Sequence, residues 1–159
     1  MGADAMHTPD HNNERSSIEA KLAEYTGQPG WRSERLSQRP DGTWDLDLSD
    51  LDVSDLSTLR NTNISGLDLR DTGVERLDGL RGLRLFSLNL AGTKVEDLKP
   101  LRPMPLKNLI LDGTEVRNLE HLRNMPLTRL HAKSDSIEDF STIGTLQELE
   151  ELSLPLHAA

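Results

Sequence analysis

Hydrophobic residues recur along this chain with a period of 21 residues. The pattern opens with an L-x-L pair, and its first leucine is repeated as Leu46, Leu67, Leu88, Leu109 and Leu130. The second position of the pair is held by Leu48, Leu69, Leu90, Leu111 and Ala132. Fixed periods of this length are typical of repeat architectures, in which each unit buries its apolar residues against its neighbours. The sequence therefore predicts a solenoid of five full repeats, followed by a truncated sixth.

Each repeat is expected to contain a short strand, a tight turn and a return arm. The two leucines of an L-x-L pair fall on one face of a strand, and the residue between them falls on the other. Apolar residues then recur at every third position, as in Val74, Leu77 and Leu80, which favours a 3₁₀-like or irregular arm over an α-helix. Pro100 and Pro103 agree, because proline removes a backbone donor and disrupts helices.

The segment Leu85-x-x-Leu88-x-Leu90-x-x-Thr93-x-Val95 resembles the core motif of the leucine-rich-repeat family, L-x-x-L-x-L-x-x-N-x-L. The resemblance implies an α/β solenoid, a right-handed horseshoe with 21-residue repeats, short parallel strands on the concave face and 3₁₀ or irregular convex arms. This sequence departs from the motif at the asparagine, which is replaced by Leu51, Thr72, Thr93, Thr114 and Asp135. We expect the threonine hydroxyls to bond the turn where the asparagine amide usually does.

Two stretches are also similar to bacterial arrays of this family that are often found beside serine/threonine kinases. One is the amino-acid sequence of residues 92–101, and the other is Gln28-Pro29-Gly30-Trp31 ahead of the first strand. This similarity implies a bacterial protein with a role as a signalling scaffold. The kinase itself is absent from the sequence.

The ends of the chain differ from the repeats. Residues 1–15 are polar and are predicted to form a disordered tail, and residues 157–159 a second tail. Residues 16–43 are predicted to form an N-terminal cap, with a helix at about 17–26 that starts from the S-x-x-E spacing of Ser16 and Glu19. Trp31 and Trp44 are expected to seal this cap against the repeat domain, which spans 44–156.

Composition narrows the function. The net charge of −9 disfavours nucleic acid as a partner, because binding to phosphates depends on Lys and Arg. The chain has no cysteine, and no apolar run reaches the length of a membrane span. These features predict a cytoplasmic protein that does not bind membranes. We expect a monomer, with pairing through the edge of the last strand as the alternative.

No constellation for catalysis or for cofactor binding is recognisable. The five histidines do not match a recurrent metal motif, and there is no glycine-rich phosphate loop. The carboxylates of Asp45 and Asp47 are expected at the strand surface, where solvation explains them better than acid-base chemistry. The sequence therefore predicts no enzyme activity, no metal and no cofactor, with hydrolysis kept as the enzymatic alternative.

The outward positions of the strands are the candidate site for a partner protein. They alternate with the leucines, and we name ten of them as predicted binding residues: Asp45, Asp47, Asp68, Arg70, Asn89, Ile110, Asp112, Arg129, His131 and Lys133. Carboxylates dominate the first strands and cations the fifth, with Ile110 between them as an apolar anchor. The leading hypothesis is a protein-interaction module. The alternatives are an inhibitor or immunity protein that neutralises a basic target through its acidic strands, and a designed or excised fragment.

Overall fold

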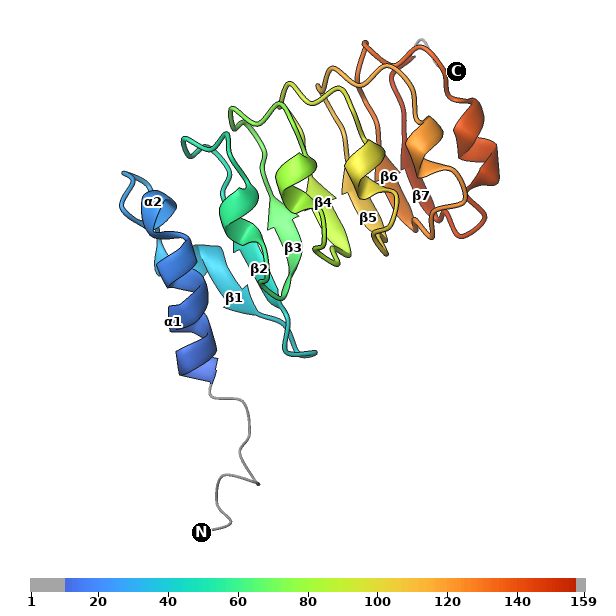
Figure 1. The fold of residues 1–159 in the computed structure, drawn as a ribbon. Helices are drawn as coiled ribbons and strands as arrows, with labels where there is room; N and C mark the ends of the chain where they lie inside the picture. Colours follow the sequence, from blue (N-terminus) through green and yellow to red (C-terminus); the bar gives the residue numbers. More distant parts are fainter. Residues whose placement is uncertain (1–10, 157–159) are drawn as a thin grey trace, which may run out of the picture.

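Seven short strands form a single sheet along one side of the molecule in the computed structural model, which describes residues 11–156 (Figure 1). The strands are β1 (Leu36–Gln38), β2 (Trp44–Asp47), β3 (Ile64–Asp68), β4 (Ser87–Asn89), β5 (Asn108–Ile110), β6 (Arg129–His131) and β7 (Glu151–Ser153). They lie in the sheet in chain order. The predicted tails at 1–10 and 157–159 lie outside the described residues.

Strands β2 to β7 run parallel, as the sequence predicts. Leu67 lies opposite Leu88, Leu88 opposite Leu109, and Leu109 opposite Leu130. The recurring leucines of the sequence therefore occupy equivalent positions on neighbouring strands. Parallel neighbours need a crossover segment, and the arm of each coil supplies it.

The first strand was not anticipated. β1 pairs with β2 in the antiparallel direction, with Leu36 opposite Leu46. The turn between them contains Asp41 and Gly42, and Gly42 has a φ of 87°, a conformation that glycine adopts without steric cost. β1 and the turn lie inside the predicted cap at 16–43, and β2 opens the predicted repeat domain.

The return arms contain short 3₁₀-helices, in agreement with the three-residue spacing. They are η3 (Ser57–Leu59), η4 (Asp78–Leu80), η5 (Lys99–Leu101), η6 (Glu120–Leu122) and η7 (Ser141–Thr145), and η2 (Ser33–Arg35) precedes β1. The four arms from η3 to η6 each end on a fully buried leucine. The arms therefore close the core on the side opposite the sheet (Figure 1).

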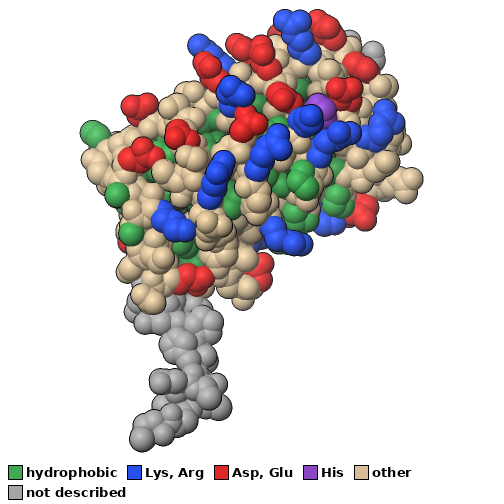
Figure 2. Space-filling view, viewed as in Figure 1, with side chains coloured by type: hydrophobic (Ala, Val, Ile, Leu, Met, Phe, Trp, Pro, Cys, Tyr) green, Lys and Arg blue, Asp and Glu red, His purple; other side chains and the backbone are tan. Residues whose placement is uncertain are grey.

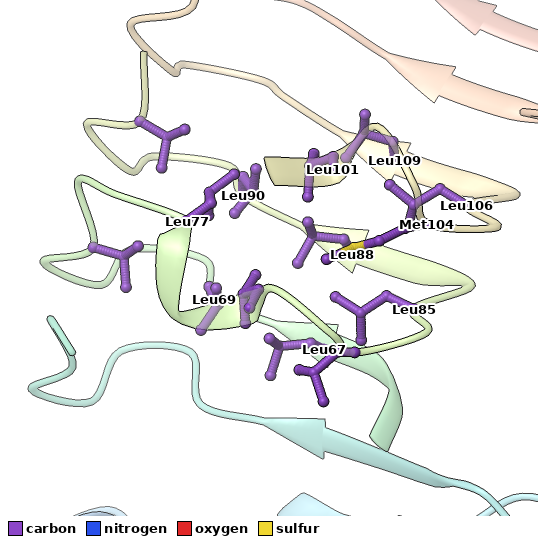
Figure 3. Packing of buried hydrophobic residues seen from close by; sticks show 14 of the residues in the cluster. Leu67, Leu69, Leu77, Leu85, Leu88, Leu90, Leu101, Met104, Leu106 and Leu109 are labelled. Atoms are coloured by element: carbon purple, nitrogen blue, oxygen red, sulfur yellow. The ribbon is translucent and has the colours of Figure 1, made fainter. Parts of the chain in front are cut away.

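Aliphatic side chains fill the space between sheet and arms (Figure 3). In one coil, Leu88 of β4 and Leu90 just after it share this core with Leu98 and Leu101 from the arm, and each has at most 1% of its surface exposed. Equivalent residues of the next coil continue the same columns. Burial of this kind stabilises the fold by about 1.5 to 3 kcal/mol for each such side chain.

Buried threonines support the turns after the strands, as expected from their place in the motif. The hydroxyl of Thr72 donates to the Leu69 carbonyl at 2.7 Å, and Thr93 repeats this bond to Leu90 at 2.7 Å. Thr114 does the same in the next repeat, at 2.8 Å. A buried carbonyl is thus satisfied in each of these coils without the family's asparagine.

The N-terminal helix starts earlier than the predicted range of 17–26. Helix α1 spans His11–Lys21 and α2 spans Ala23–Thr26, so residues 11–15 are helical and Ser16 lies inside the helix and cannot cap it. Contacts distant in sequence hold this first part: Arg15 donates to the carbonyls of Leu36, at 2.7 Å, and Ser33. Local capping rules cannot detect such contacts.

The inner side of this helical segment packs on the first coil. Ile18, Leu22 and Tyr25 are buried, and the Tyr25 hydroxyl donates to the carbonyl of Asp55. Burial raises the pKa of Tyr25 to about 12. Trp44 is buried at the start of β2, and Trp31 is partly buried against the same core.

The other end of the stack is less covered. Strand β7 pairs with β6 on one side only, and among the described strands none lies beyond it. Leu152 of this strand is 40% exposed, whereas its neighbour in the sheet, Leu130, is fully buried. The last coil therefore lacks the second neighbour that each central coil has.

Candidate protein-binding surface

The outward side chains of the sheet form a surface that we call the strand face. A shallow groove of about 330 Å³ runs over it from β1 to β5. Of the ten predicted binding residues, five line this groove: Asp45, Asp47, Asp68, Asn89 and Ile110. The sheet thus brings together residues from four repeats.

The other five predicted residues lie outside the groove. Arg129 and His131 are on β6, and three residues lie two places after the ends of β3, β5 and β6: Arg70, Asp112 and Lys133. Arg70 and Lys133 are exposed, whereas Asp112 is half-buried. The Asp112 carboxylate accepts a hydrogen bond from the backbone nitrogen of Lys133 at 2.7 Å, so it also holds the turn of the next coil.

Two arginines that the sequence analysis missed neutralise the acidic end of the groove. Arg39 donates to the Asp45 carboxylate at 2.9 Å. Arg35 contacts the Asp47 carboxylate at 3.4 Å and also donates to the carbonyls of Asp47 and Ser49, at 3.2 and 2.9 Å. Both come from the segment around β1, and the only sequence signal for their approach was the Asp-Gly turn of the hairpin.

Asp68 lies at the middle of the groove and is half-buried. Loss of solvent on burial raises the pKa of its carboxyl, and the negative charges of Asp47 and Asp50 act in the same direction. The backbone nitrogen of Arg70 donates to it at 3.0 Å, which opposes the shift. The protein therefore holds a carboxylate here in an unfavourable environment, where a cation from a partner would stabilise it.

The basic end of the strand face is also neutralised from within. Glu151 of β7 accepts from Arg129 at 2.8 Å, and its other carboxylate oxygen lies 2.7 Å from His131 Nε2. These two bonds lower the pKa of the Glu151 carboxyl. The predicted polarity, acidic strands followed by a basic fifth strand, is thus weaker than the sequence suggests, because β1 and β7 supply opposite charges.

Two apolar side chains interrupt this polar surface. Ile110 is half-buried, between Asn89 on β4 and His131 on β6. Phe86 precedes β4 and is 37% exposed; it lines a second groove of about 430 Å³ together with Arg39 and Lys107. The exposure of Phe86 could not be predicted from alternation, because this residue lies two places before Leu88 and alternation would put both side chains on the inner side.

The part of the chain that the structure describes contains neither a cluster of metal-ligating side chains nor a membrane-spanning helix. No three His, Asp or Glu side chains between 11 and 156 are grouped so that they could hold a metal ion. In the same part of the chain, no helix is both long and apolar enough to cross a membrane.

Each coil from β2 to β6 contributes one short parallel strand and one 3₁₀ arm, and columns of leucine fill the space between them. This architecture is that of leucine-rich-repeat proteins. The chain is a leucine-rich-repeat protein.

Solved structures similar to this chain include two internalins of Listeria monocytogenes. The first, an internalin (inlF), is 29% identical with a TM-score of 0.61, over 65% of this chain and 32% of the internalin. The chain thus spans about a third of the length of that protein. The second, internalin C2, is 22% identical with a TM-score of 0.50, over 69% of this chain and 70% of the internalin, and shows the fold alone. No family model and no curated protein matches the chain.

Proposed function

We propose that this chain is a non-enzymatic interaction module that binds a partner protein on its strand face. The observation that carries the proposal is the groove from β1 to β5, in which Ile110 lines one end and the ion-paired side chains of Asp45 and Asp47 line the other. Protein interfaces typically place a few apolar anchors inside a polar rim. Side chains that are ordered before binding lose less conformational freedom when the partner docks.

The proposed binding surface joins the predicted residues to three that the structure adds. The additions are Arg35, Arg39 and Phe86. Arg39 lines both grooves, so Phe86 and Ile110 lie on one continuous surface. We expect these two side chains to contribute most of the binding energy, because desolvated apolar anchors dominate most interfaces.

The finer features remain part of this proposal. We infer a right-handed horseshoe with a concave strand face, a cap at 16–43 ahead of a repeat domain at 44–156, and a cytoplasmic monomer in a bacterial signalling scaffold. Tyr25 bonds the helical segment to the carbonyl of Asp55 in the first coil, which supports the cap. Arg15, in the part of α1 before residue 16, bonds Ser33 and Leu36 within the cap.

Neutralisation of a basic target, the alternative raised by the acidic strands, has less support. Asp45 and Asp47 already have arginine partners within the chain, so a basic target would have to compete with Arg39 and Arg35. Exposed pairs of this kind contribute only about 0.2 to 1 kcal/mol each. Charge alone is therefore a weak basis for tight inhibition.

Site-specific photocrosslinking in the native cell tests the proposal. A photoreactive phenylalanine analogue would replace Ile110 in one variant and Glu96, which is exposed beside the 3₁₀ arms, in the control. We expect a protein crosslinked through position 110 and none through position 96. Crosslinks through position 96 alone, or through neither position, would refute binding on the strand face.

A further inference from the structure

Four arginines occupy one position of the repeat. Arg60, Arg81, Arg102 and Arg123 each directly follow the 3₁₀-helix of their coil, and all four are exposed. Since η3, η4, η5 and η6 contact one another in turn, the arginines follow one another along the stack. We call this row the arginine column.

A lysine continues the row at its N-terminal end. Lys21 of α1 donates to the carbonyls of Arg60 and Asn61, at 3.1 and 3.4 Å, which places its charge beside the first arginine. Gly144 stands at the equivalent position of the fifth repeat and ends the row. Figure 2 shows Lys and Arg side chains following one another along the stack on the face that this view presents.

The arginines of the column make few direct ion pairs, although the carboxyls of Asp55 and Asp139 lie near enough to Arg60 and Arg123 to feel their charge. Of the four arginines in the column, only Arg81 lies within ion-pair distance of a carboxylate of the described residues. Its partner is Asp78 at 3.6 Å, and Asp78 also pairs with Arg76. By comparison, Arg35, Arg39 and Arg129 on the strand face all have carboxylate partners.

The repetition of one charged residue type distinguishes the arginine column from another polar position of the same repeat. Five residues earlier in each repeat, the chain has Asp55, Arg76, Asp97 and Asn118, which differ in charge. A chain with a net charge of −9 thus repeats a cation at one position of four successive coils while its neighbours vary. Solubility alone requires no such alignment, because charge anywhere on the surface serves it.

We propose that the arginine column binds an extended acidic segment of a protein, which lies along the stack. Guanidinium groups bind carboxylates through two parallel hydrogen bonds, and a row of them favours a linear ligand. With about 4.8 Å between coils, four arginines span about 15 Å, the length of roughly five extended residues.

A nucleic acid fits this surface less well than a narrow peptide. Hydrogen bonds from Ser57, and to a smaller extent the charge of Arg60, lower the pKa of the Asp55 carboxyl, and Asp78 lies beside Arg81. These carboxylates border the column, and a broad phosphate backbone would approach them together with the arginines. A single peptide strand can contact the arginines alone. This second surface does not depend on the strand face, so either proposal can fail while the other stands.

Fluorescence anisotropy with a labelled peptide that has glutamate at alternate positions tests the column. We expect saturable binding at about 50 mM salt that weakens at about 200 mM, as screening predicts. Arg102→Glu combined with Arg123→Glu should weaken binding about tenfold or more, because two favourable contacts become repulsive. Lys94→Glu with Arg117→Glu is the matched control: both residues are exposed and off the column, and the change in net charge is the same. It should weaken binding less than about threefold, the effect of long-range charge alone.

Two further measurements identify the class of ligand and test whether the variants are folded. A peptide with glutamine in place of glutamate should not bind, and a single-stranded oligonucleotide of the same charge should bind more weakly than the acidic peptide. Circular dichroism melts should show both variants folded. No binding of the acidic peptide, an equal loss in the control variant, or tighter binding of the oligonucleotide would overturn the proposal.

Discussion

The two sides of the same strands follow different rules. On the inner side, Leu88, Leu109 and Leu130 are nearly identical in environment, and each is at most 1% exposed. On the outer side, the neighbouring residues of β4 and β5 are Asn89 and Ile110, which share neither size nor polarity. The inner side repeats because each coil must fit the coils on both sides. The outer side is free to vary, and it is there that the chain can specify a partner.

The largest expected effect on stability comes from comparing substitutions at two adjacent residues, one on each side of the sheet. Leu111→Ala removes a fully buried side chain from the centre of the stack and should cost about 2 to 5 kcal/mol of unfolding free energy. Ile110→Ala, one residue earlier and half-buried on the strand face, should cost less than about 1.5 kcal/mol. Urea denaturation measures both. Equal costs would show that the two faces are not distinct.

The next largest effect concerns Tyr25, whose burial connects the N-terminal helical segment to the core and makes stability depend on pH. Tyr25 is buried and has a pKa raised to about 12, so it stays neutral in the folded protein while the unfolded chain ionises near pH 10. Stability is fully present below about pH 10 and should fall by about 2 kcal/mol as the pH rises to 12.

Tyr25→Phe removes the titrating group, and the chain has no other tyrosine. The variant should lose less stability than the wild type between about pH 10 and pH 12. Denaturant melts across this range measure the difference. Parallel losses in the two proteins would mean that the Tyr25 hydroxyl is not buried against the first coil.

A smaller effect concerns the turns that join the two sides. Thr93→Val keeps the shape of the side chain but removes the hydroxyl that donates to Leu90, and should cost about 1 kcal/mol. Thr93→Ser keeps the hydroxyl and serves as the control for the hydrogen bond. Thermal melts should give the wild type the highest melting temperature, and the loss of the bond should lower that of Thr93→Val. A neutral Thr93→Val would mean that the turn does not need the threonine.

The smallest effect is on the outer side. Burial raises the pKa of Asp68, so ionisation of this carboxyl near neutral pH opposes folding, and the opposition disappears once acid protonates both states. Asp68→Asn keeps an oxygen for the Arg70 nitrogen and should raise the melting temperature slightly at pH 7. The gain should vanish as the pH falls toward about 4 and below. A variant that is less stable at pH 7 would contradict the unfavourable environment assigned to Asp68.

Features that repeat locally could be predicted from the sequence. The L-x-L spacing predicted the short strands, the three-residue spacing predicted the 3₁₀ arms, and the position of Thr93 in the motif predicted its bond to the turn. Each depends on residues a few places apart, so the pattern contains the information. The same logic placed Asp68 and Ile110 on one surface.

Features that depend on distant partners could not be predicted in this way. Arg15 fixes the start of helix α1 through carbonyls about twenty residues away, and Arg39 reaches Asp45 only because β1 folds back on β2. Glu151 neutralises Arg129 from the next strand, and the spacing of residues along the chain does not reveal that their side chains pair. Charge read along the sequence therefore overstated the polarity of the strand face.

The most direct test of the account is the affinity of the crosslinked partner for Ile110→Glu, measured by calorimetry beside the unfolding free energy of the same variant. We expect affinity to fall tenfold or more, because a charge would replace an apolar anchor, while the free energy of unfolding stays within about 1.5 kcal/mol of the wild type. Unchanged affinity in a variant that is fully folded would contradict a partner-binding role for the strand face.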